Sequence, residues 1–269
     1  MRIPILWRAV LRLSLFVLLF VGSFASLVFA QQPPMPHSNP WDKSGDKPKI
    51  WLEITYGAHL PAGILAQRFG FTTSVGGDVV RRVPSRWFYG VSGYYFFGYD
   101  LREDPLANYR TAQGSILDQD REIGIMSADE RGFYVGGIVG KIIPFIPSLP
   151  NAGIRVSLSG GYLQHFIRLK DDNARIPLLQ GDYAKGFDRL TDGVALTEFV
   201  GFHYASPRGF FSAYIGTEFT QGFTHSVRAY QYDLGPTRDE TTRLDLLNGL
   251  RIGWTLEIGQ KKKASEVYY

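Results

Sequence analysis

Residues 249–258 read GLRIGWTLEI, and this stretch alternates strictly between two kinds of side chain. The even-numbered positions are apolar, whereas the odd-numbered positions are glycine, polar or charged. A period of two places the two sets on opposite faces of a β-strand. The segment therefore predicts a strand with one apolar face and one face that carries Arg251 and Glu257.

The same period recurs along the chain from residue 49. Three further segments alternate clearly, at residues 52–59, 154–162 and 211–219, and four weaker ones lie at residues 70–83, 87–99, 131–143 and 193–205. In the last of these, Glu198 shares a face with Val194 and Val200, which predicts a bulge or a shifted register. Eight strands without intervening helical patterns indicate an all-β chain.

Long and short connections between these strands alternate. The long ones span residues 61–69, 101–130, 169–192 and 223–243, and the short ones span residues 84–86, 144–153 and 206–208. Outer-membrane barrels sort their loops in this way, with short periplasmic turns and long external loops. Closure into a ring also removes the strand edges, which lipid cannot hydrogen-bond. We therefore predict a transmembrane, up-and-down antiparallel β-barrel of eight strands over residues 49–260.

In such a barrel the apolar face meets lipid and the polar face lines the interior. Charges on the interior face are expected to pair with one another as a lumen charge network: Glu53, Arg155, Glu218, Arg251 and Glu257. Because side chains fill the interior of an eight-stranded barrel, we predict a filled lumen rather than a pore. Aromatic residues near strand ends suit interfacial girdles, although strand propensity alone also explains them: Trp51, Trp87, Tyr99, Tyr162, Phe166, Phe219 and Phe223.

The charge balance of the chain argues against a nucleic-acid partner. The 269 residues carry a formal net charge of +4, but three of the basic residues, Arg2, Arg8 and Arg12, lie in one short segment without acidic residues. Without these three residues the net charge of the chain is close to zero, so the chain lacks the excess of basic residues that binding to nucleic-acid phosphates requires. The absence of cysteine excludes disulfides, a lipidated N-terminal cysteine and thiol catalysis.

The two ends of the chain carry signals of export. A basic start, the apolar run 13–21 and small residues near position 30 predict a cleavable signal peptide over residues 1–30, with an uncleaved anchor as the alternative. Residues 31–48 are rich in proline and predict a flexible periplasmic leader. Residues 261–269 are expected to form a C-terminal tail, whose three lysines are either solvated or in contact with a periplasmic partner.

Several short motifs stand out in the body of the chain. They are Arg131-Gly132-Phe133-Tyr134, Gln164-His165, Gly181-Asp182-Tyr183, Lys185-Gly186, Asp188-Arg189-Leu190, Gln221-Gly222-Phe223-Thr224 and Leu246-Leu247-Asn248-Gly249. Over about residues 50–269 this pattern resembles a small outer-membrane barrel family of Bacteroidota, itself distantly similar to barrels associated with type IX secretion. The resemblance implies an outer-membrane barrel of a Gram-negative cell and brings no catalytic residues. The final Tyr268-Tyr269 resembles the aromatic signal that barrel-assembly machinery recognises.

The external loops supply the candidate partner-binding residues. Residues 100–130 are strongly acidic, which fits bound cations, a basic partner or a merely solvated loop. The next two loops mix charges with aromatics and contain our candidate residues: Asp182, Tyr183, Lys185, Asp188, Arg189, Arg228, Tyr230 and Tyr232. For the third loop the alternative is a self-packed structure. For the fourth, the alternatives are stacking on sugars, binding of lipopolysaccharide phosphate and contact with the membrane rim.

The motifs of common enzymes and metal sites are missing from the sequence. It contains five histidines but no GxSxG, HExxH or paired-histidine spacing, so we expect neither catalysis nor a metal or cofactor. The predicted function is a structural or accessory outer-membrane component whose external loops engage a partner protein or an envelope or secretion complex. A surface ligand-binding or adhesin-like barrel and a narrow channel are the alternatives. Other expected contacts are outer-membrane lipid, lipopolysaccharide and the barrel-assembly machinery.

Overall fold

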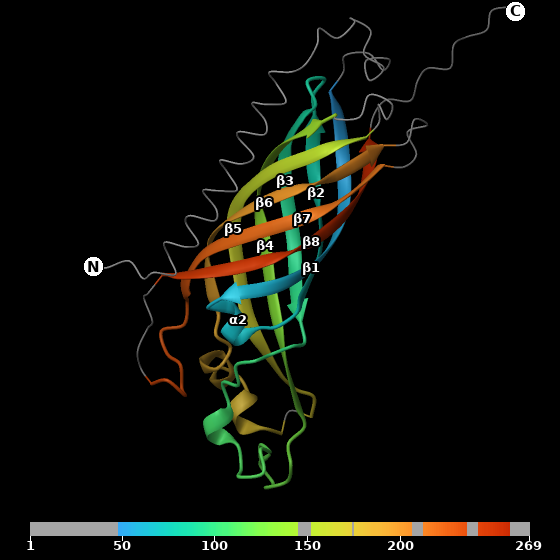
Figure 1. Ribbon diagram of the computed structural model, residues 1–269. Helices are drawn as coiled ribbons and strands as arrows, with labels where there is room; N and C mark the ends of the chain where they lie inside the picture. Colours follow the sequence, from blue (N-terminus) through green and yellow to red (C-terminus); the bar gives the residue numbers. More distant parts are fainter. Residues whose placement is uncertain (1–47, 145–151, 174, 206–211, 236–241, 259–269) are drawn as a thin grey trace, which may run out of the picture. The chain divides into compact units, whose positions relative to one another are not determined.

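The structure, a computed structural model, describes residues 48–144, 152–173, 175–205, 212–235 and 242–258. The expected signal peptide, nearly all of the leader and the tail at residues 261–269 lie outside the described residues. In the barrel, each strand pairs antiparallel with its neighbours in sequence and the first strand pairs with the last (Figure 1). The predicted eight-stranded, all-β, up-and-down barrel is confirmed.

The barrel wall consists of strands joined by turns and by loops that contain short helices. The strands are β1 (Lys49–Gly63), β2 (Thr72–Arg82), β3 (Trp87–Gly98), β4 (Met126–Ile143), β5 (Ala152–Asp171), β6 (Thr191–Ala205), β7 (Ser212–Ser226) and β8 (Arg243–Ile258). The helices are α2 (Leu65–Arg68), η2 (Ala107–Tyr109), η3 (Pro177–Leu179) and η4 (Tyr183–Gly186). Within the described ranges, the helices are all too short or too polar to cross a membrane.

The register of the strands fixes their tilt. A path that starts at Ile50 on β1 and steps to the paired residue on each following strand returns to β1 at Leu60, ten residues further along. The residues passed on the way are Arg81, Tyr89, Val139, Leu158, Glu198, Phe219 and Asn248. With strands about 4.8 Å apart and a rise of about 3.3 Å per residue, this offset tilts the strands by about 40° from the barrel axis.

The long connections lie together at one end of the barrel, as the alternation predicts. They are loop 1 (residues 64–71), loop 2 (99–125), loop 3 (172–190) and loop 4 (227–242), of which residues 174 and 236–241 are not described. β4 has 18 residues and β5 has 20, so both are longer than their patterns predict. Because about 9–11 residues suffice to cross a bilayer, these two strands carry the sheet beyond it and support loops 2 and 3.

Glu198 lies on β6 without a bulge. The pairing of β6 with β5 and β7 runs without interruption through Glu198, which is opposite Leu158 on one side and Phe219 on the other. The predicted bulge or register shift is therefore wrong. The alternation of β6 is regular, and a carboxyl group occupies one of its outward positions.

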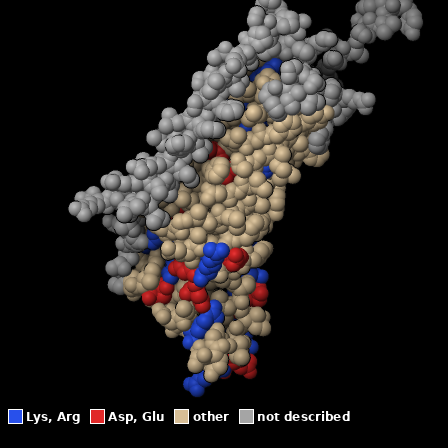
Figure 2. All heavy atoms as spheres, in the orientation of Figure 1, with Lys and Arg blue, Asp and Glu red and all other residues tan. Residues whose placement is uncertain are grey.

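The outside of the barrel is apolar and its inside is polar. Large hydrophobic side chains on the strands remain exposed on the outside: Ile50, Leu52, Ile54, Tyr56, Val75, Val79, Tyr89, Val91, Tyr95, Val135, Val139, Leu158, Val194, Phe202, Ile215, Leu250, Ile252, Trp254 and Leu256. Figure 2 shows most of the visible wall free of charged residues, which gather at the loop end. The expected girdle residues Trp87, Tyr162 and Phe223 also face outward.

Trp51 departs from the girdle prediction. It is only 5% exposed and stacks on the His203 ring inside the barrel, with 5.7 Å between ring centroids. Its position has the parity of Glu53, so the strand pleat turns both side chains inward. The nearness of Trp51 to a strand end therefore predicts the wrong position, whereas its place in the alternating pattern predicts the inward position correctly.

Glycine pairs allow two strands to pack around bulky interior side chains. Gly136 of β4 is paired with Gly161 of β5. A Cβ atom on Gly161 would lie 2.2 Å from the Val135 carbonyl oxygen, and one on Gly136 would lie 2.3 Å from the Tyr134 hydroxyl. Only glycine fits these positions without movement of the strands, as expected for glycines that permit close approach.

Candidate functional site

The half of the lumen nearer the short turns holds a buried ion pair between opposite walls. Arg155 of β5 donates two hydrogen bonds to the Glu53 carboxylate of β1, at 2.7 and 2.6 Å. The guanidinium lies 4.0 Å from the centroid of the Tyr214 ring and 4.3 Å from that of Phe88. Thr255 also donates to Glu53, at 3.2 Å. Bidentate geometry and aromatic faces together satisfy charges that are otherwise costly to bury.

A second group of charges lies nearer the loop end. Arg251 forms an ion pair with Glu218 and donates a hydrogen bond of 2.9 Å to the Tyr94 hydroxyl. Tyr94 in turn donates to the Asp78 carboxylate, at 2.5 Å. His59 shares a hydrogen bond of 2.8 Å with Ser74 beside this group. Side chains from several strands are thus linked across the interior and fill it.

The predicted lumen network differs from the observed one in two ways, because one predicted residue lies outside it and three of its residues were not predicted. Glu257 lies apart from the other four residues, one position before the end of β8 and beyond the last residue paired with β7. It pairs with Lys49, 2.7 Å away, and both side chains are partly exposed. Sequence reasoning missed Asp78, Tyr94 and Tyr214, although Asp78 shares the parity of the buried Ser74 on β2. The glycines at 76 and 77 obscured that alternation.

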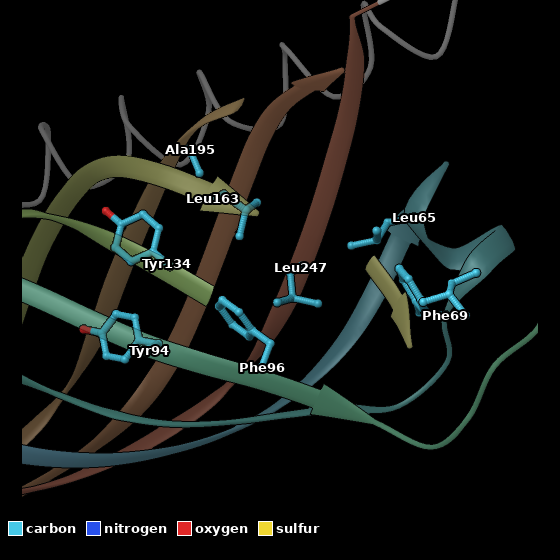
Figure 3. Close-up of a cluster of buried hydrophobic side chains, with 9 residues drawn as sticks. Leu65, Phe69, Tyr94, Phe96, Tyr134, Leu163, Ala195 and Leu247 are labelled. Atoms are coloured by element: carbon cyan, nitrogen blue, oxygen red, sulfur yellow. The ribbon is translucent and has the colours of Figure 1, made fainter. Parts of the chain in front are cut away.

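An apolar plug closes the loop end of the lumen. Leu65 of α2 and Phe69 of loop 1 pack with Phe96, Leu163 and Leu247 from the strands (Figure 3). Phe69 has no exposed surface. The plug therefore separates the interior charges from the loops and, together with the filled centre, leaves the narrow-channel alternative without support.

A histidine and a carboxylate meet within the plug, two residues nearer the loops than Leu163 and Leu247. His165 is within 2.8 Å of Asp245, and the edge of its ring meets Phe69, with 5.7 Å between centroids. Thr224 donates its hydroxyl hydrogen bond to Asp245 rather than to His165. The threonine oxygen is therefore not activated by the imidazole, as a nucleophile of the serine-hydrolase type would be.

Arg189 of loop 3 joins the loops to one another. Its side chain is buried and donates to Glu103 of loop 2 at 2.7 Å and to Asp233 of loop 4 at 2.8 Å. Glu103 also pairs with Arg68 of α2, at 3.0 Å. Burial alone would lower the pKa of Arg189, but the hydrogen bonds to Asp233 and Glu103 outweigh it and raise the pKa. A cavity of about 450 Å³ beside this junction is lined by Ile64, Gln67, Arg68, Glu103 and Arg243.

Loops 2 and 3 also share a small hydrophobic core. It consists of side chains that are at most 2% exposed: Leu106, Ile116, Ile176 and Phe187. Loop 4 is tied to loop 3 by Arg228, which donates from Nε to the Asp188 carboxylate at 3.0 and 3.1 Å. Hydrogen bonds to Asp188 raise the pKa of Arg228, although partial burial opposes them. We call the described residues of loops 2, 3 and 4 the loop body.

Three tyrosines form an exposed ridge on the loop body. The Tyr183 and Tyr232 rings stack with 5.5 Å between centroids, and Tyr230 meets Tyr232 edge-on at 4.9 Å. All three are more than a third exposed, and Tyr183 reaches 58%. Gly186 makes room for this arrangement, because a Cβ there would lie 2.0 Å from the Tyr232 ring. Beside the ridge, the Lys185 ammonium donates to Asp182 at 2.6 Å and lowers the pKa of that carboxyl.

The eight candidate partner-binding residues therefore fall into two groups. Asp188, Arg189 and Arg228 bind other loop residues and hold the loop body together. The other five lie at the surface: Asp182, Tyr183, Lys185, Tyr230 and Tyr232. The third loop is self-packed and also presents an exposed surface, so the two interpretations of its sequence are compatible.

The acidic residues of loop 2 are partly neutralised by arginines. Asp104 pairs with Arg110, and Asp120 pairs with Arg175 of loop 3. Asp118 accepts the backbone N–H groups of residues 120 and 122, at 2.8 and 2.9 Å. Over the described residues, His, Asp and Glu side chains form no group of three or more that is arranged to hold a metal ion. The acidic stretch is thus a folded loop, with several carboxylates directed at loop partners.

These features define the class of protein. The apolar exterior of this closed barrel suits contact with lipid. Its interior, filled with paired charges, would be a poor hydrophobic core for a protein surrounded by water. The chain is a transmembrane up-and-down β-barrel of eight strands with a filled lumen.

Comparison with known proteins adds no closer identity. No family model and no curated protein matches the chain. Three solved structures are similar over most of their length: Neisserial surface protein A (9% identity, 78% of this chain and 97% of that one, TM-score 0.40), the attachment invasion locus protein Ail of Yersinia pestis (8%, 79% and 99%, 0.41) and a major outer membrane protein from Thermus thermophilus (11%, 78% and 99%, 0.41). Similarity this low carries no residue or activity over to this chain. The resemblance to a Bacteroidota family and to secretion-associated barrels remains a prediction.

Proposed function

We propose that the protein is an integral outer-membrane barrel without catalytic activity whose loop body docks a partner protein outside the cell. The exposed apolar wall supports insertion in a membrane, and the expected signal peptide supports export. In this proposal lipopolysaccharide surrounds the wall, and barrel-assembly machinery inserts the chain. A larger envelope or secretion complex is the expected partner.

The observation that carries the docking proposal is the tyrosine ridge on a preorganised support. Loops that merely covered the barrel would bury their large aromatics, yet Tyr183, Tyr230 and Tyr232 remain exposed on a body fixed by Arg189. Exposed aromatic side chains on a rigid surface are typical centres of protein interfaces. Preorganisation also lowers the entropy lost on binding.

The test is a mild-detergent pull-down of the tagged protein from its own cells. The native chain should recover a stoichiometric partner, and Tyr183→Ala with Tyr230→Ala should lose it. Phe71→Ala removes an exposed aromatic of loop 1, outside the loop body, and should keep the partner. Recovery of the barrel alone, at normal copy number, would contradict the proposal.

A second candidate function is surface recognition of a glycan. The exposed aromatic side chains of the ridge favour it, because aromatic rings stack on sugars. Asp182 and Lys185 add polar groups beside them. Binding of the purified barrel to a glycan array, lost in the same Tyr183→Ala, Tyr230→Ala variant, would favour this function over protein docking.

A further inference from the structure

Glu198 places a carboxyl group on the lipid-facing wall near the middle of the membrane. It lies six residues from Asp192 toward the loops and six from Tyr204 in the opposite direction, on the same outward face of β6. Its ladder neighbours Leu158 and Phe219 are exposed and apolar. Within the described part of the chain its Oε1 atom has no hydrogen-bond partner. Such a group is costly in lipid unless another molecule satisfies it.

A second outward polar side chain, Gln221 of β7, lies directly above Glu198. Glu198 is paired with Phe219 on the neighbouring strand β7, and Gln221 lies two residues beyond Phe219 toward the loops. For strands tilted by about 40°, these two steps combine into a displacement of about 8 Å parallel to the barrel axis, toward the loops. The opposite two steps lead from Glu198 to Val156 of β5, about 8 Å below it. Val156, Glu198 and Gln221 thus form one line along the axis.

The chemistry of this line is self-complementary. A neutral carboxylic acid and a primary amide each carry a hydrogen-bond donor and an acceptor, so each can pair with a copy of itself. Two copies with the same membrane orientation are related by a two-fold axis along the membrane normal, which keeps every residue at the depth of its counterpart. An axis on this line therefore faces Glu198 with Glu198 and Gln221 with Gln221.

We propose that the protein forms a two-fold dimer through the outward wall of β5, β6 and β7, centred on these two self-pairs. The same symmetry brings apolar side chains together on both sides of the line. Phe219 faces Leu196 of the second copy, and Leu158 faces Val200 of the second copy, because these residues lie at similar depth on opposite sides of Glu198. The contact therefore has a polar centre flanked by apolar packing, an arrangement that satisfies the carboxyl group inside the membrane.

The test measures association of the purified barrel in phosphatidylcholine vesicles. The chain has no cysteine, so Ala112→Cys in loop 2 gives one labelling site for energy transfer between donor-labelled and acceptor-labelled copies. The native barrel should show transfer above random proximity that falls as lipid dilutes it. Glu198→Leu should weaken association about tenfold, as expected for loss of a central polar pair in a bilayer. Glu198→Gln should retain association, because amides also self-pair.

Leucine is favoured on a lipid-facing wall, so Glu198→Leu is expected to fold, and the heat-sensitive electrophoretic migration of the barrel checks this. Val79→Leu on β2, four strands away, is the matched control and should leave energy transfer unchanged. A short bis-maleimide should join Val156→Cys to itself but not Val79→Cys. Transfer no greater than random for the native barrel, or equal transfer for the native barrel and Glu198→Leu, would overturn the dimer.

Discussion

Glu53 and Arg155 are among the most deeply buried side chains of the described barrel, each about 1% exposed. Each of the two charges neutralises the other, so removal of one leaves the other buried and unpaired in a low-dielectric interior. We expect Glu53→Leu to lower the free energy of unfolding by about 3–5 kcal/mol. Urea unfolding of the refolded barrel in phospholipid vesicles, followed by tryptophan fluorescence, measures the change.

The double variant Glu53→Leu, Arg155→Met separates loss of pairing from loss of packing. It removes both charges and should recover much of the lost stability, since apolar replacements of buried ion pairs are often neutral or stabilising. Glu257→Gln is the control at the strand ends, where the pair with Lys49 is partly exposed, and should cost no more than about 1 kcal/mol. A double variant as unstable as Glu53→Leu alone would show that the ion pair is not the cause.

At the scale of elements, the loop 1 plug is expected to contribute packing energy. Phe69 is fully buried against strand residues, whereas Phe71 two positions later is 49% exposed. Phe69→Ala should therefore lower the free energy of unfolding by about 3–5 kcal/mol, and Phe71→Ala should change it by about 1 kcal/mol or less. Equal losses in the same urea unfolding experiment would refute the role of the plug.

The loop body depends on Arg189, which also has a left-handed backbone conformation with φ of 51°. Arg189→Ala removes the bonds to loops 2 and 4 and leaves Glu103 and Asp233 without this partner. Hydrogen exchange should accelerate in all three loops, while exchange in the strands stays unchanged. Arg168→Ala, whose guanidinium is more exposed and pairs with Asp129 of β4, serves as the control and should leave loop exchange near native. Faster exchange confined to loop 3 would argue against a single loop body.

The sequence predicts the strands better than the contacts between loops. Alternation alone identifies β1, β5, β7 and β8, because one face of each meets lipid and the other meets paired charges. The loop body could not be predicted, since Arg189 and Glu103 are 86 residues apart and their pairing depends on tertiary structure. At Glu198 the prediction failed for a different reason. The alternating pattern correctly places Glu198 on the outward face of β6, and the error was the assumption that every charged residue faces the lumen.

At the scale of the whole barrel, the outer wall is apolar and suits lipid, and the loops bind one another. A barrel of this kind should resist extraction from membranes by alkaline carbonate and should migrate faster in electrophoresis before heating than after it. Recovery of the native chain in the soluble fraction would contradict the membrane assignment, because the apolar residues on the outside of the strands would then be exposed to water.

We propose that the barrel spans the outer membrane with loops 1 to 4 outside the cell. Labelling of single cysteines in intact cells by a membrane-impermeant maleimide can test this orientation, because the native chain contains no cysteine. Ala112→Cys lies exposed in loop 2, and Ser85→Cys lies exposed in the turn between β2 and β3 at the opposite end. We predict that Ala112→Cys is labelled in intact cells and that Ser85→Cys is labelled only after the outer membrane is opened. Labelling of Ser85→Cys but not Ala112→Cys in intact cells would show that the loops face the periplasm.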